Sequence, residues 1–190
     1  MFKASKACYD LIKRSEDEKG FLAGKCSTLK SYICPSGLWT CGWGSTRGVT
    51  KDTVWTQEQA DARLVEDVAE SEALLLKRFT PSLKRPTLAQ GQVDALVSFI
   101  FNMRKSQFTE ARCTLLRQLN AGAPTEQVAE QFPLWVYGRD PKTGLKEQKP
   151  GLVKRRAAER ALFMLDSWES EARQQANAIN QAAVAALPRR

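Results

Sequence analysis

Three carboxylates end the first amphipathic segment, in which Leu11 and Ile12 precede Glu16, Asp17 and Glu18. At the C-terminal end of a helix, the helix dipole carries partial negative charge, which favours the protonated form of a carboxyl group. A carboxyl group that is protonated near neutral pH is what a glycosidase uses to protonate a leaving oxygen. Taken alone, an acidic helix end is more often simply solvated. The group becomes a candidate general acid only together with the residues that follow it.

A short aromatic segment comes next. Between Tyr32 and Trp43, aromatic residues alternate with small or polar ones, and a tight turn at 35–37 separates two short apolar runs. This pattern predicts a β-hairpin with one buried and one open face. Gly42 and Gly44 flank Trp43, and glycines in a strand mark either a bulge or the close approach of a backbone or a ligand.

The motifs resemble those of the phage-type lysozymes and endolysins of glycoside hydrolase family twenty-four. LIK-x-x-Glu is followed by Tyr-x-Cys-Pro-Ser-Gly-x-Trp-Thr-x-Gly-x-Gly, and three further blocks come in the family's order: ALVSFIFN (95–102), TLLRQLNAG (114–122) and PGLVKRRAAERALF (150–163). The resemblance implies an α+β, mostly helical fold with two lobes joined by a long helix. A small lobe with the hairpin would span about 1–55 and a larger helical lobe about 56–168, followed by a basic helical extension at 169–190.

The resemblance also assigns site residues. It places the general acid at Glu16, the threonine that helps to hold the attacking water at Thr40, and a second catalytic position, often aspartate in the family, at Cys34. Three further residues match positions that line the family's cleft: Thr46, Phe101 and Asn102. The implied reaction is hydrolysis of the β-1,4 bond between N-acetylmuramic acid and N-acetylglucosamine in peptidoglycan, without a cofactor, leading to lysis of the host cell.

An insertion and a replaced carboxylate depart from the family pattern. Residues 17–28 lie between the acid and the hairpin, and Glu18, with a glycine two residues on, is an alternative acid. The intact helical register favours Glu16. A neutral thiol at Cys34 cannot act as a carboxylate base, so a thiolate does the work, or Thr40 and Glu16 suffice, or Asp17 or Glu18 substitutes.

Two smaller departures leave other functions open. Ser45 stands where the family has histidine, and Arg104 stands where it usually has glycine. One alternative is therefore an inactive lysozyme-like protein that binds peptidoglycan or serves in a virion. The other is a lytic transglycosylase, which needs the acid but no partner that activates water.

Composition restricts partners and location. The net charge of +8 favours an acidic partner, and peptidoglycan with its peptide carboxylates fits as well as nucleic acid, for which no motif is present. No apolar run approaches the roughly 20 residues of a membrane span, and the N-terminus lacks an apolar signal core. We therefore expect a monomer that accumulates in the host cytoplasm and reaches the periplasmic wall through a separate pore. Five cysteines without a CxxC pair, and no histidine, favour reduced thiols and no metal site.

The spacing of apolar residues, together with residues that typically start or stop helices, predicts the elements that must position these residues. Capping boxes are expected at Thr56 with Gln59 and at Thr87 with Gln90. Either Arg155 or Arg156 is expected to pair with a carboxylate at a helix end. The tail at 169–190 is expected to be a polar extension or to contact the outer envelope. Helices are expected at 4–18, 56–80, 87–102, 109–120, 125–137 and from 151 on, with a hairpin at 29–46 and loops at 19–28 and 138–150.

Overall fold

The structure is a computed structural model that describes residues 2–140 and 143–165. The predicted extension at 169–190 lies outside these residues. The helices are α1 (Lys6–Glu16), α2 (Glu18–Leu22), α3 (Gln57–Arg78), α4 (Gln90–Asn102), α5 (Thr114–Asn120), α6 (Thr125–Ala129) and a last helix at 150–165. Two 3-10 turns, η1 (Lys105–Gln107) and η2 (Phe132–Leu134), connect them.

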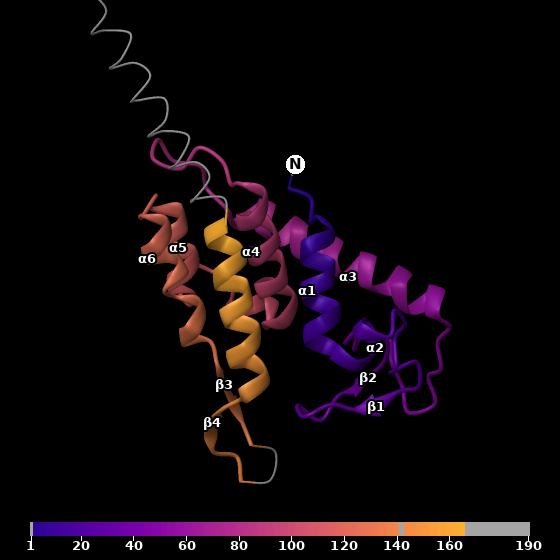
Figure 1. Cartoon of the computed structure of the whole chain (residues 1–190). Coiled ribbons are helices and arrows are strands. Elements are labelled where there is room, and N and C mark those ends of the chain that lie inside the picture. The colour runs from indigo at the N-terminus through magenta and orange to yellow at the C-terminus, as the bar shows by residue number, and fades with distance from the viewer. Residues whose placement is uncertain (1, 141–142, 166–190) are drawn as a thin grey trace, which may run out of the picture.

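Two small antiparallel sheets complete the fold. One pairs β1 (Tyr32–Ile33) with β2 (Trp39–Thr40), and the other pairs β3 (Tyr137–Arg139) with β4 (Lys146–Gln148). Figure 1 shows β1 and β2 beside α1 and α2, and the remaining helices gathered around α4. The predicted α+β, mostly helical class is confirmed.

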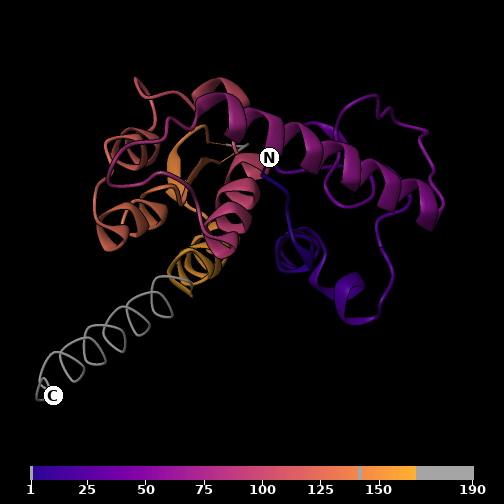
Figure 2. The same cartoon turned by 90° about the horizontal axis from the view of Figure 1, so that it is seen from above.

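The long helix α3 joins the two parts of the molecule, as Figure 2 shows from above. It begins with the predicted capping box: the Thr56 hydroxyl accepts from the Gln59 N–H at 3.2 Å, and the Gln59 side chain accepts from the Thr56 N–H at 2.9 Å. Its 22 residues correspond to a rod of about 33 Å. Within 2–140 and 143–165, no helix is both long and apolar enough to cross a membrane.

The centre of the larger lobe is α4, as predicted. All residues from 91 to 100 are buried, because the helix is apolar nearly all round and other helices cover it. The Phe99 ring meets Phe132 and Trp135 edge-on at 5.4 and 5.5 Å, and Phe132 in turn contacts Phe163 of the last helix. These contacts fix the last helix against α4, and both helices carry site residues.

Several predicted boundaries were wrong. The capping box predicted at Thr87 is absent, because α4 begins after Ala89. The Ala89 N–H donates to the Gln92 side chain at 3.2 Å. The helix expected at 109–120 begins only at Thr114, and the one expected at 125–137 ends at Ala129. The break falls before Pro133, which lacks the N–H that a continuing helix needs.

Two segments expected to be loops contain regular structure. The β3–β4 hairpin occupies 137–148, most of the loop expected at 138–150, and the short helix α2 (18–22) covers the start of the loop expected at 19–28. The predicted first helix stops at Glu16, because the Asp17 backbone leaves the helical region at φ −150°. The Asp17 side chain then caps α2 by accepting from the Gly20 N–H at 2.9 Å.

Candidate active site

Glu16 is the last residue of α1, and its side chain lies against the last helix. Its Oε1 accepts a hydrogen bond from Arg155 Nη1 at 2.5 Å, although 139 residues separate the two in sequence. The Glu16 side chain is 21% exposed and therefore reaches solvent from a mostly enclosed position. The pairing of one of the two arginines with a helix-end carboxylate is as expected, and Arg155 is the partner.

Gly44 leaves the space that the Glu16 carboxylate occupies. A Cβ atom at Gly44 would lie 2.6 Å from Glu16 Oε2, and the glycine has φ +89°, in the region that L-residues rarely adopt. The close approach expected at the glycines of the hairpin is therefore an approach by the candidate acid itself.

Arg155 is held rigidly in the interior, where it is 4% exposed. Its Nε donates to Glu159 at 3.1 Å and its Nη2 to the Ser98 carbonyl at 3.1 Å. Burial lowers the pKa of Arg155, but the charges of Glu16 and Glu159 outweigh burial and raise it above its usual value. The guanidinium that faces Glu16 is thus permanently charged.

Glu18, the alternative acid, lies on the surface. Its side chain is 61% exposed and pairs at 3.7 Å with Arg14, which is equally exposed. Such a pair contributes little to stability and holds neither group in a fixed geometry. The structure gives Glu18 no enclosed environment, whereas Glu16 has one.

Asp17 is occupied in supporting the insertion. Its carboxylate accepts from the Ser27 N–H at 2.6 Å and the Ser27 hydroxyl at 2.7 Å, in addition to the Gly20 N–H. Burial raises the pKa of Asp17, but the hydrogen bonds from Ser27 and Gly20 outweigh it and hold the pKa below its usual value. Asp17 is therefore unavailable as a substitute for the missing aspartate of the hairpin.

Cys34 and Thr40 lie together on the β1–β2 hairpin. The Cys34 Sγ is 2.9 Å from the Ser36 hydroxyl, and the Thr40 hydroxyl donates to the Leu38 carbonyl at 3.1 Å. Burial raises the pKa of the Cys34 thiol, but polar groups around it, with the Ser36 hydroxyl the largest contributor, outweigh burial and lower the pKa below its usual value. The hairpin thus makes the Cys34 thiol easier to ionise than an ordinary cysteine, at the position where the family often has a carboxylate.

Tyr32 links the hairpin to the candidate acid. It pairs with Thr40 in the β1–β2 register. Burial raises the pKa of its hydroxyl, and the nearby charges of Glu16 and Cys34 raise it further. Tyr32 was predicted to lie in the hairpin but was not among the predicted site residues, although its place in the Tyr-x-Cys motif was a signal for it.

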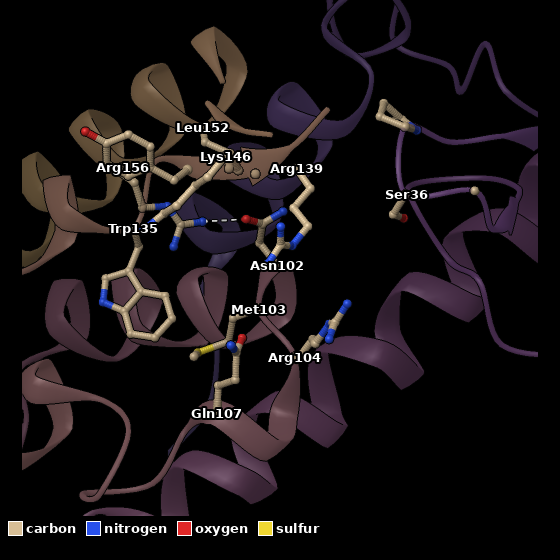
Figure 3. Close-up of a pocket in the computed structure, with 14 residues that line it drawn as sticks. Ser36, Asn102, Met103, Arg104, Gln107, Trp135, Arg139, Lys146, Leu152 and Arg156 are labelled. Atoms are coloured by element: carbon tan, nitrogen blue, oxygen red, sulfur yellow. Dashed lines mark hydrogen bonds between the residues drawn. The ribbon is translucent and has the colours of Figure 1, made fainter. Parts of the chain in front are cut away.

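A cavity of about 990 Å³ lies between the β1–β2 turn and the helical lobe, with Asn102 in its wall (Figure 3). The Asn102 Oδ1 accepts from Arg156 Nη2 at 2.8 Å, and burial lowers the pKa of Arg156 to about 10. Four basic side chains and, among the described residues, no carboxylate line this cavity: Arg104, Arg139, Lys146 and Arg156. The cavity therefore suits an uncharged or anionic ligand.

The other two predicted cleft residues lie elsewhere. Thr46 and Phe101 line a separate cavity of about 260 Å³ together with Gly44. Neither lining includes Glu16, Cys34 or Thr40, but each includes a neighbour of one of them: Gly44, beside Glu16, lines the smaller cavity, and Ser36, beside Cys34, lines the larger. In the part of the chain that the structure describes, no group of three or more Cys, Asp or Glu side chains could hold a metal ion.

Comparisons with known proteins show which family this chain resembles over most of its length. The phage lysozyme family model matches residues 25–159. The endolysin of Acyrthosiphon pisum secondary endosymbiont phage 1 is 43% identical over 135 residues, 71% of this chain and 86% of that protein. The endolysin of Salmonella phage P22 is 34% identical over 154 residues, 80% and 92% of the two chains. The muramidase domain of SpmX from Asticaccaulis excentricus superimposes with a TM-score of 0.70 at 28% identity, covering 86% of this chain and 99% of that one.

Proposed function

We infer the roles of individual residues from one premise: the chain belongs to the phage lysozyme family. The resemblance predicted from its motifs is confirmed, and the protein is an endolysin with muramidase activity on bacterial peptidoglycan. The matched region begins after Glu16, so the assignment of the acid depends on the geometry around that residue.

Glu16 is the general acid in this proposal. It would protonate the oxygen that leaves when the bond between N-acetylmuramic acid and N-acetylglucosamine breaks. The assignment rests on the enclosed position of the Glu16 carboxyl group. Buried Arg155 lies on one side of it, and Gly44, which has no side chain, lies on the other. A carboxyl group held in this way keeps one orientation toward the sugar, which is the main requirement for efficient proton transfer.

The β1–β2 hairpin supplies the groups that act on water. The Thr40 hydroxyl and the Cys34 thiolate would hold and activate a water molecule that attacks the opposite face of the sugar. Direct attack by water inverts the anomeric centre and requires roughly 6.5–9.5 Å between the acid and base groups. The glycan would be contacted by Asn102 from the larger cavity and by Thr46 and Phe101 from the smaller one.

The route to the substrate is also part of the proposal. We propose that a monomer accumulates in the host cytoplasm and reaches the periplasmic wall through a separate pore, without a nucleic-acid partner. Five free thiols suit a reducing compartment, and the charge of +8 suits the anionic wall. The segment at 169–190 would add contact with the outer envelope.

The test is clearing of outer-membrane-permeabilised Gram-negative cells by the wild type, Glu16→Gln and Glu18→Gln, with mass spectrometry of the released fragments. We expect a loss of about 10²- to 10⁴-fold for Glu16→Gln alone, and reducing muramic acid ends in the products. Anhydromuramic ends would identify a lytic transglycosylase instead. Wild-type protein that sediments with peptidoglycan but clears no cells would identify an inactive binding protein.

A further inference from the structure

A fully buried carboxylate, Glu159, lies behind the site and has no part in the mechanism above. It is fully buried on the last helix, one turn after two arginines. Its carboxylate lies 3.1 Å from Arg155 Nε and 3.1 Å from Arg156 Nη1, and it accepts from the Ser98 hydroxyl at 2.8 Å. One carboxylate therefore holds two neighbouring guanidinium groups.

The opposite ends of both guanidinium groups reach the site. Arg155 Nη1 donates to Glu16, and Arg156 Nη2 donates to Asn102 in the wall of the larger cavity (Figure 3). Arg156 also lies over the Phe99 ring, 4.7 Å from its centroid, which limits its freedom to turn. Each arginine thus uses one edge for Glu159 and another for a residue at the site.

This arrangement is more than stability requires. Buried ion pairs carry a large desolvation cost, and apolar residues of similar size often replace them without loss of stability. A cluster retained only for stability has no reason to direct both cations toward the site. The charge balance gives one: two guanidinium groups face two carboxylates, and without Glu159 both positive charges would act on Glu16 alone.

We propose that Glu159 is a positioning residue that, through Arg155 and Arg156, sets the balance of charge beside Glu16 and keeps Asn102 in place. This rests on the proposed role of Glu16 as the acid. Charged or titratable groups close to Glu16 include Arg155 and Arg156 from the last helix and Tyr32 from β1, with Cys34 beside Tyr32. Glu159 faces the guanidinium groups of both arginines; burial raises the pKa of Glu159, and the two positive charges act against that rise.

The test is the pH dependence of kcat/KM for Glu159→Gln on isolated peptidoglycan. Activity of a general acid falls as pH rises and the acid ionises. Removing the negative charge of Glu159 leaves the guanidinium groups uncompensated, which favours ionised Glu16. We therefore expect the alkaline limb of the profile to move to lower pH by about one unit. Glu159→Asp, which keeps the charge but shortens its reach, should move the limb in the same direction by less.

Glu72→Gln is the matched control. Glu72 is also a buried carboxylate, but it accepts from Lys3 Nζ at 2.9 Å and the Ala4 N–H at 2.7 Å, away from the site. It should lower stability without moving the alkaline limb. If Glu159→Gln does not fold, the smaller shift in Glu159→Asp serves as the test.

An unmoved alkaline limb in a folded Glu159 variant would overturn the proposal, as would an equal shift in Glu72→Gln. Glu16→Gln, measured in parallel, separates this outcome from failure of the proposed mechanism. Full activity in Glu16→Gln would overturn the assignment of the acid and the role of Glu159 together. An inactive Glu16→Gln beside an unmoved limb would overturn the role of Glu159 alone.

Discussion

Replacing Gly44 by alanine tests the position of the candidate acid without touching the acid itself. The new Cβ would lie 2.6 Å from Glu16 Oε2 and 2.8 Å from its Cδ, both too short for the groups to stay where they are. The carboxyl group must move away, toward or past Arg155. The alanine must also adopt φ +89°, which costs an L-residue roughly 1–2 kcal/mol.

Gly24→Ala separates the two effects. Gly24 has φ +70°, is exposed, and would place its Cβ within 4 Å of no other atom. Both variants should therefore lose roughly 1–2 kcal/mol of unfolding free energy from the backbone alone. Only Gly44→Ala should lose catalysis, by about 10²-fold, because a misplacement of about 1 Å in a catalytic group costs that much.

Urea unfolding and cell clearing measure the two quantities in the same preparations. The expected result is similar unfolding midpoints for the two alanine variants and clearing rates that differ by about two orders of magnitude. Equal clearing rates at equal stability would refute the reasoning. Either Glu16 would then lie away from Gly44, or its carboxyl group would not carry the reaction.

Three further predictions concern other parts of the molecule. The folded-state pKa of Asp17 is lowered, so ionised Asp17 stabilises the protein at pH values above its unfolded-state pKa of about 4. This stabilisation is lost as pH falls through the lower folded-state pKa. Asp17→Asn should therefore flatten the acid side of a plot of urea unfolding midpoints against pH. Leu96→Ala, at a fully buried position of α4, should cost about 2–5 kcal/mol in urea unfolding, whereas Leu83→Ala at an exposed position should cost less than about 0.5 kcal/mol. Iodoacetamide should modify Cys34 first among the five thiols, since its pKa is lowered while burial raises that of Cys8 and Cys113. Mass spectrometry would show the order of modification, and cell clearing should fall in step with alkylation of Cys34.

Local patterns predicted the helices that form the framework of the site. The spacing of apolar residues placed Ile12 in the interior and Glu16 at the end of α1, and the run from Val93 to Ile100 predicted a helix buried on every side. The Gly-x-Gly pattern predicted a close approach at Gly44. Each of these features depends on residues within a few turns of one another.

The features that the sequence did not predict depend on distant or weak interactions. α2 has only five residues, too few for helical periodicity to be visible. β3 and β4 contain mostly charged and polar residues, so their pairing leaves no alternation of apolar and polar positions. Arg155 or Arg156 was expected to pair with a helix-end carboxylate, but which arginine pairs, and with which carboxylate, is set by the packing of the first helix against the last.

The contact between Glu16 and Arg155 also orders events during translation. A ribosome that adds about 5–20 residues per second needs roughly 7–30 s to travel the 139 residues from the acid to its partner. Throughout that interval α1 is outside the ribosome or in its tunnel without the last helix to pack against. The acid therefore gains its guanidinium partner only after nearly the whole chain has been made, and a truncated polypeptide lacks a complete site.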